Sequence, residues 1–278
     1  MADRIFLIIL LFSSLPLVIG VPDGFEMVSG IIQAFFLPGF AVLSFMRSRD
    51  RHWFDKIVLS ALLSPVILTV TTLILAETGI PWERSLRISL FAACFIIGVA
   101  MATGRFREAD SKLSIPWNVP VICVAFAGLI AACFTINPDL LKRSDAWYHA
   151  SVTSEILARG IPPMEPLLAD FPIKYMWYYH LFIASVVRLS HLQLFTALGL
   201  FNVMAAFSFP YLLARYASFF TKNAKKTAII VLLGLAGLES VSWFLWPVEL
   251  ARSLTGDVRG MAEIARTFGK IEFNSSNV

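Results

Sequence analysis

The stretch "KIVLSALLSPVILTVTTLILA", residues 56–76, decides the fold class of this chain. Its only charge is the lysine at its first position, and a helix of about 20 apolar residues is long enough to cross the hydrocarbon core of a bilayer. In hydrocarbon every backbone N–H and C=O must be paired within a helix or a closed barrel. The strands of a barrel alternate apolar and polar residues, whereas this run is continuous. The stretch therefore predicts a transmembrane helix.

The whole chain has the same character. Of its 278 residues, 58% are hydrophobic and 15% are charged, and the mean hydropathy is +0.74. A soluble domain is about half apolar and about a quarter charged. Further apolar runs of suitable length lie at residues 5–20, 28–46, 87–103, 117–136, 194–219 and 227–248. We therefore predict an all-α, polytopic transmembrane helical bundle with about seven spans in a lipid bilayer.

The basic residues indicate orientation, although a net charge of +4 and a pI near 9.0 would also fit nucleic-acid binding. They lie in short clusters between apolar runs, chiefly at 47–56 and 105–112, which is the pattern of cytoplasmic loops in membrane proteins. We therefore expect no nucleic-acid partner. In an inner or plasma membrane this orientation places the loop that begins at residue 137 outside the cytoplasm. The three cysteines lie within apolar runs and are expected to be buried thiols.

Residues 176–191, "MWYYHLFIASVVRLSH", form another helical pattern that is short for a span. If this helix crossed the membrane, the lysine cluster at 222–226 would lie outside, against the charge rule. The alternative is a helix along the outer surface, with its Trp and Tyr side chains at headgroup depth. We favour this second placement, which gives an outer loop at 137–193 with two interfacial helices.

The outer loop contains "KRSDAWYHASVTSEILARGIPPMEP", residues 142–166, in which polar and aromatic residues are dense. Ser144 is the expected helix N-cap, and Asp145 would lie in the first turn, where the helix dipole favours a negative charge. Gly160 and the following prolines end the helix. Asp145 and His149 are four residues apart, so their side chains should project from the same side of the helix.

Asp145 is the candidate catalytic residue. An aspartate in a loop most often caps a helix, but here Lys142, Arg143 and Lys174 lie nearby in the sequence. Cationic side chains suit a lipid-linked phosphate. At the outer surface, a carboxylate beside such cations would fit glycosyl transfer, because it would deprotonate an acceptor hydroxyl while the cations stabilise the departing phosphate.

The aromatic and histidine residues of the loop complete the predicted substrate-binding set. Tyr175 and Tyr178 would stack on sugar faces, and His149 is included with them, although its ordinary role is packing against an aromatic ring. His180 is expected to be interfacial rather than catalytic. No second ligand stands at a metal-binding spacing and no Asp-x-Asp pair is present, so no metal site is predicted and dependence on a divalent cation is left open. No cofactor is predicted. Glu239, within an apolar run, has no assigned role.

The segment "SDAWYHASVTSEILARGIPPMEP", followed by the stretch from Lys174 to Phe220, resembles the first outer loop and following span of GT-C-fold membrane glycosyltransferases. These include the oligosaccharyltransferase catalytic subunit and protein mannosyltransferase relatives. In that superfamily this loop holds an essential Asp at the head of an interfacial helix, and Asp145 matches it. "DAWYH" is similar to the Asp-x-Trp-Tyr-His of some oligosaccharyltransferases. The resemblance implies transfer of a sugar from a polyprenyl-phosphate-linked donor on the outer leaflet.

The resemblance also implies a domain organisation. Residues 1–116 would hold four N-terminal spans that the family does not usually have, residues 117–250 a GT-C-like core, and residues 251–278 an extracytoplasmic tail. Complete members have more spans, so we expect the N-terminal part of a longer enzyme. Glu249 and Asp257 are positional candidates for a second catalytic acid. Two alternatives remain open: a polytopic transporter or lipid flippase, and a non-catalytic membrane subunit.

Overall fold

The computed structural model describes residues 2–17, 23–46, 52–103, 116–142, 145–166, 171–174 and 176–237. These residues contain helices and no strand, apart from an isolated bridge between Met164 and Pro172, which confirms the predicted all-α class. The chain divides into two compact units, Met1–Leu212 and Leu213–Val278. The basic clusters at 47–51 and 105–112, Glu239 and the tail 251–278 lie outside the described residues.

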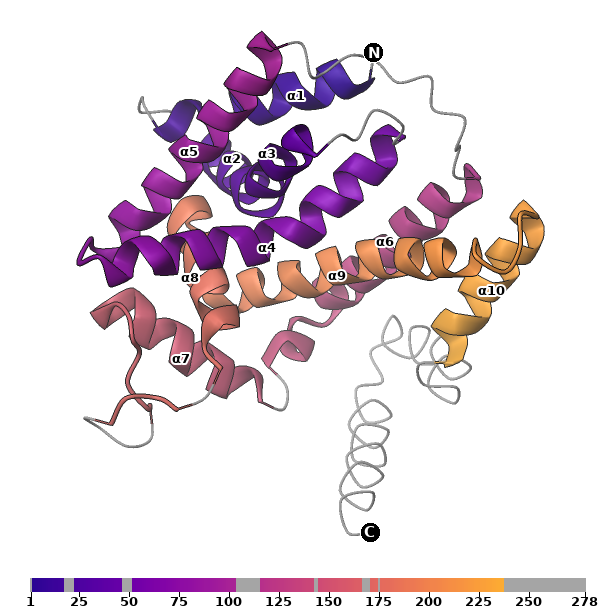
Figure 1. Cartoon of the computed structure of the whole chain (residues 1–278). Coiled ribbons are helices and arrows are strands. Elements are labelled where there is room, and N and C mark those ends of the chain that lie inside the picture. The colour runs from indigo at the N-terminus through magenta and orange to yellow at the C-terminus, as the bar shows by residue number, and fades with distance from the viewer. Residues whose placement is uncertain are drawn as a thin grey trace. The chain divides into compact units, whose positions relative to one another are not determined.

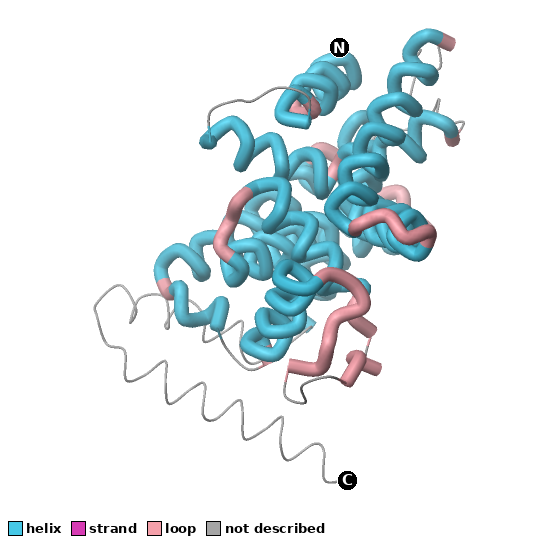
Figure 2. Tube along the Cα trace, turned by 90° about the vertical axis from the view of Figure 1, so that its left-hand side faces the viewer, coloured by secondary structure: helices cyan, strands magenta, loops and turns pink. Residues whose placement is uncertain are grey.

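Figure 1 shows the order of the helices, and Figure 2 shows the same helices from the side. They are α1 (Ala2–Phe12), α2 (Asp23–Phe35), α3 (Leu37–Phe45), α4 (Trp53–Glu77), α5 (Trp82–Ala102), α6 (Asn118–Ile136), α7 (Ala146–Arg159), α8 (Tyr178–Ser190), α9 (Leu194–Ala217) and α10 (Ala224–Gly237). Two short 3₁₀ helices, η1 (Leu15–Leu17) and η2 (Pro138–Lys142), precede α2 and α7.

Four of these helices, α4, α5, α6 and α9, are long and apolar enough to cross a membrane. A fifth span is obtained if α2 and α3, which are bent by 41° at their junction, are taken together. Helix α1 has 11 residues, and α10 has 14 residues up to Gly237, the last residue that the structure describes. At about 1.5 Å per residue neither reaches across about 30 Å of hydrocarbon. The described residues therefore support four or five spans, and the count of seven stays a prediction.

The junction of α2 and α3 divides the predicted run 28–46 into two helices. Pro38 lies at the start of α3, where it cannot donate a backbone hydrogen bond to the preceding turn. The next N–H, that of Gly39, donates to Ser64 Oγ of α4 at 2.8 Å. A Cβ atom at Gly39 would overlap with the backbone carbonyl of Ser60, so the absence of a side chain lets α3 lie directly against α4.

Helix α8 lies in the core of the first unit. Six consecutive residues, Leu181–Val186, are buried, and the helix packs against α2, α4 and α7. Figure 1 shows α8 crossing α4 steeply rather than running alongside it. Its 13 residues extend about 20 Å, too short for a span. The structure thus agrees with leaving 176–191 out of the spans, while its position along a membrane surface stays a prediction.

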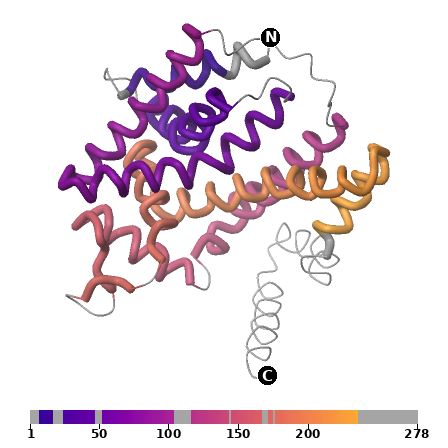
Figure 3. The backbone as a smooth tube through the Cα atoms, in the orientation of Figure 1, coloured from indigo at the N-terminus to yellow at the C-terminus, as the bar shows by residue number. Residues whose placement is uncertain are grey.

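Helix α7 lies at the same end of the first unit as the turn between α4 and α5. Residues 79–83 of that turn and residues 157–161 at the end of α7 line one cavity. The two segments can be followed on the left of the backbone trace in Figure 3. The side of the membrane that these two segments face stays a prediction.

In the second unit, α10 begins at a well-formed cap. The side-chain oxygen of Asn223 accepts hydrogen bonds from the backbone N–H groups of Lys225 at 2.9 Å and Lys226 at 3.2 Å. Such a cap satisfies N–H groups that have no partner within the helix. The lysine cluster at 222–226 therefore lies in the exposed connection between α9 and α10 and in the first turn of α10.

Candidate functional site

Asp145 lies directly before α7, at the N-cap position, and Ala146 is the first helical residue. The Asp145 carboxylate makes no capping hydrogen bond to the helix. It turns instead toward His149, and Asp145 Oδ2 lies 3.2 Å from His149 Nε2. The predicted side-by-side placement of the two residues is therefore observed. The Asp145 side chain is 73% exposed, so it remains accessible to another molecule. The prediction of Ser144 as the N-cap, with Asp145 inside the first turn, is wrong by one position, because the helix begins at Ala146; Ser144 itself lies outside the described residues.

The second nitrogen of His149 contacts a residue that sequence reasoning had not linked to it. His149 Nδ1 lies 2.9 Å from His180 Nε2, on α8. His180 is only 1% exposed, so it is a buried residue between α7 and α8 rather than a side chain open to the membrane surface. Asp145, His149 and His180 thus form a chain of hydrogen-bonding groups that runs from an exposed carboxylate to a buried imidazole.

Burial sets the charge of the groups around this chain. Burial, together with the nearby His149, lowers the pKa of His180 to about 4, so His180 is neutral at pH 7. Burial, together with the negative charge of Asp145, raises the pKa of Tyr179 to about 12. At neutral pH the buried end of the hydrogen-bond chain, His180, is therefore a neutral imidazole, and Tyr179 is a protonated phenol.

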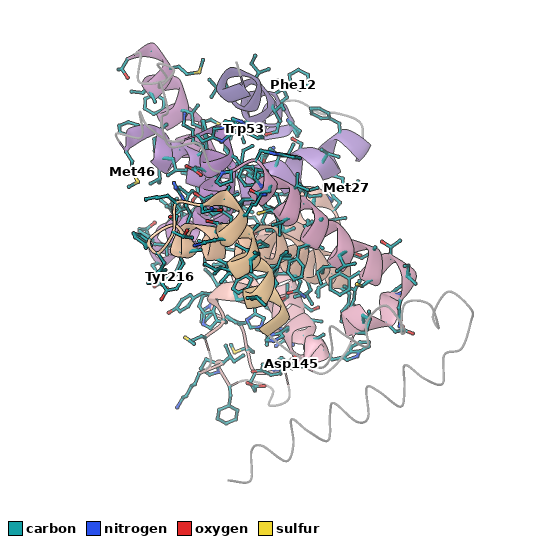
Figure 4. The ribbon with its side chains drawn as sticks, turned by 90° about the vertical axis from the view of Figure 1, so that its right-hand side faces the viewer. Phe12, Met27, Met46, Trp53, Asp145 and Tyr216 are labelled. Atoms are coloured by element: carbon teal, nitrogen blue, oxygen red, sulfur yellow. The ribbon has the colours of Figure 1, made fainter. Side chains whose placement is uncertain are left out.

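A pocket of about 670 Å³ opens beside Asp145. In Figure 4 Asp145 lies low in the view, in the pink segment that contains the outer loop. The pocket is formed by η2, by the starts of α7 and α8, and by the second and third turns of α9. Its polar lining consists of Asp145, His149, Tyr178, Tyr179, His180 and Asn202, and its apolar lining includes Leu140, Leu141, Leu198 and Phe201. Its volume is in the range of ligand-binding pockets.

An apolar pocket of about 550 Å³ adjoins the polar one. Its wall on α4 consists of Pro65, Val66, Thr69, Val70 and Leu73, and Phe182 of α8 lies across from them. Tyr178, Tyr179 and Phe201 line both pockets, so the two share an aromatic border. Val66 and Val70 are exposed residues of a helix long enough to span a membrane, and the apolar pocket is therefore open to the surroundings of that helix.

The two predicted cationic residues that the structure describes, Lys142 and Lys174, are not part of this pocket lining. Lys142 forms an exposed ion pair with Asp139 at 3.4 Å on η2. Lys174 is exposed in the segment before α8. Neither lines the pocket beside Asp145, whereas the predicted His149 and Tyr178 do. Arg143 and Tyr175 lie outside the described residues, as do Glu249 and Asp257.

Three polar lining residues were not in the predicted set: Tyr179, His180 and Asn202. The sequence signal for Asn202 is a single amide within the apolar stretch "ALGLFNVMAAF". Tyr179 and His180 stand within the quoted aromatic cluster, but nothing local connects them with Asp145.

The described residues contain no group of three or more His, Cys, Asp or Glu side chains arranged to hold a metal ion. Asp145, His149 and His180 do not form such a group, because the two ring nitrogens of His149 are directed to Asp145 and to His180 rather than to a common point between the three side chains. Comparisons with protein-family models, with curated proteins and with solved structures found no match for this chain. Function is therefore inferred from the site itself, together with the sequence resemblance.

Proposed function

We propose that this chain is a membrane glycosyltransferase, or the N-terminal part of one, that transfers a sugar from a polyprenyl-phosphate-linked donor with Asp145 as the general base. One observation supports this proposal above the others: the polar pocket beside Asp145 shares an aromatic border with an apolar pocket on a membrane-length helix. A lipid-linked sugar has the same two parts, a polar head and a hydrocarbon tail.

The two pockets suit the two parts of such a donor. A hydrocarbon tail in the apolar pocket would remove apolar surface of both partners from water, at about 25 cal/mol per Å². The head would then lie across Tyr178 and Tyr179, whose rings offer flat faces to a sugar and whose hydroxyls can hydrogen-bond. A small water-soluble sugar would have no use for the apolar half.

The proposed chemistry needs one proton acceptor. Asp145 takes the proton of an acceptor hydroxyl, whose oxygen forms a bond to the anomeric carbon of the donor sugar. The bond between that carbon and the phosphate oxygen breaks, and the lipid phosphate leaves with the electron pair. Lys142, three residues before Asp145, is the described cation nearest in sequence; it lies outside the pocket lining and, to stabilise this negative charge, would have to exchange its exposed pairing with Asp139 for the phosphate.

The break between α2 and α3 favours the transporter alternative, because discontinuous spans form substrate sites in many transporters. In those sites the freed backbone groups bind the substrate. Here the N–H of Gly39 is already bonded to Ser64, and the residues at the break, Phe36 and Leu37, are apolar. We therefore rank transport second.

The test is the substitution Asp145→Asn, which keeps the size of the side chain and removes its capacity to take a proton. Wild-type and variant proteins in vesicles are supplied with radiolabelled polyprenyl-phosphate sugars and acceptors, and transfer is measured. We expect a loss of about 10²- to 10⁴-fold in the variant, as for the removal of a general base. The matched control is Glu155→Gln, a carboxylate of the same helix that pairs with Arg159 and should not be needed.

Transfer at the wild-type rate by Asp145→Asn would reject the role of Asp145. Movement of the labelled lipid across the vesicle membrane is followed in the same samples. Lipid movement without transfer by the wild-type protein would favour the flippase alternative.

A further inference from the structure

We infer that His180 is a positioning residue: its Nε2–H donates to His149 Nδ1 and thereby fixes His149 in the tautomer that donates its Nε2–H to Asp145. The hydrogen-bond order itself is a property of the folded chain. Its meaning for catalysis rests on the proposed function, in which Asp145 is the base.

The order of the protons follows from the acceptor at one end. An ionised Asp145 carboxylate can only accept, so the contact of 3.2 Å between its Oδ2 and His149 Nε2 needs a proton on that nitrogen. A neutral imidazole has one N–H, and His149 Nδ1 is then a bare acceptor. Its neighbour at 2.9 Å, His180 Nε2, must therefore donate.

The surroundings of His180 agree with this order. If Nε2 holds the single proton of neutral His180, Nδ1 has none. The buried Nδ1 makes no hydrogen bond of ordinary geometry among the described residues, and the nearby backbone of Trp177, which raises the pKa of the ring, is outweighed by burial. The depressed pKa of His180, which burial causes, keeps the ring neutral at pH 7. The rings of Tyr148 and Tyr179 lie against His149 at centroid distances of 6.2 and 5.7 Å, edge to face, and leave its two nitrogens to Asp145 and His180.

The consequence concerns the direction of the Asp145 carboxylate. This side chain is 73% exposed and makes no bond to the start of its helix, so by itself it would sample several rotamers. The His149 N–H holds Oδ2 and leaves Oδ1 for an acceptor hydroxyl. His180 is buried where α7 packs against α8. The packing of these two helices therefore fixes the buried end of the hydrogen-bond chain, and the exposed Asp145 is oriented from that end.

The experiment is nitrogen NMR of protein with ¹⁵N-labelled histidine, in which protonated and bare ring nitrogens are distinguished. The chain has four histidines, which single substitutions assign. In wild-type protein at pH 7 we expect both His149 and His180 to be protonated at Nε2 alone. In His180→Leu, His149 should become a mixture of tautomers. In His180→Gln, whose side-chain amide can replace the Nε2 donor, His149 should keep its Nε2–H.

A His149 protonated at Nδ1 in the wild-type protein, or a His149 that is unchanged in His180→Leu, overturns the inference. Thermal unfolding of each variant shows whether it is folded. If His180→Leu does not fold, the wild-type and His180→Gln spectra still decide.

Transfer assays test the role in the reaction. We expect kcat to fall about 10- to 100-fold in His180→Leu, as for a small misplacement of a reacting group, with KM within about twofold, and to recover in His180→Gln. If kcat falls as far in His180→Gln as in His180→Leu, His180 does not act by positioning His149 through this hydrogen bond. If Asp145→Asn leaves transfer intact while the NMR result is as expected, the proposed function fails and the hydrogen-bond order stands.

Discussion

Acidification should destabilise this protein through His180. Its pKa is lowered from 6.5 to about 4 in the folded chain because the ring is buried. Between these two pH values the unfolded state binds a proton that the folded state does not, so the stabilisation is complete above pH 6.5 and is lost as the pH falls toward 4. The difference of about 2.5 pKa units, at about 1.4 kcal/mol each, corresponds to about 3–4 kcal/mol for the whole interval.

The assay is thermal unfolding of the purified protein in detergent at pH 7, 6, 5 and 4. Other groups also titrate in this range, so the informative quantity is the difference between the wild type and His180→Gln, which has no imidazole at this position. The wild type should lose stability more steeply between pH 6.5 and 4. His191→Gln, at the exposed end of α8, keeps the buried imidazole and is the matched control. Parallel curves for the wild type and His180→Gln would refute the reasoning.

Two further predictions concern packing and the apolar pocket. Gly39→Ala places a Cβ against the Ser60 backbone and should lower the free energy of unfolding by about 1–3 kcal/mol, measured by thermal or denaturant unfolding. Gly98→Ala is the control and should cost much less, because nothing lies within 4 Å of the added Cβ. Equal effects of the two substitutions would contradict the close approach of α3 and α4. Val70→Trp should fill part of the apolar pocket and reduce transfer from long-chain donors while sparing short-chain analogues. Ile74→Trp, one turn further along α4 and outside the pocket lining, is its control, and an equal loss with both donor lengths would argue against a tail site.

The positions of the long apolar helices follow closely from the chain. The runs 56–76, 87–103, 117–136 and 194–219 correspond to α4, α5, α6 and α9 within a few residues. An apolar run of about 20 residues can satisfy its backbone in hydrocarbon only as a helix, so composition and length are sufficient. The run 28–46 differs because hydropathy does not register the missing N–H of Pro38, which divides it at Phe36.

The candidate site divides in the same way between local and distant causes. Asp145 and His149 could be paired from their spacing of four, because a helix brings such positions together wherever it occurs. His180 could not be joined to them, since it is 31 residues away along the chain, on another helix, and meets His149 only where α7 packs against α8. The apolar pocket likewise needs α4, α8 and α9 in their folded arrangement. Backbone geometry, which every helix shares, sets the local features, whereas the site depends on how particular side chains interlock between helices, which no short stretch of residues contains.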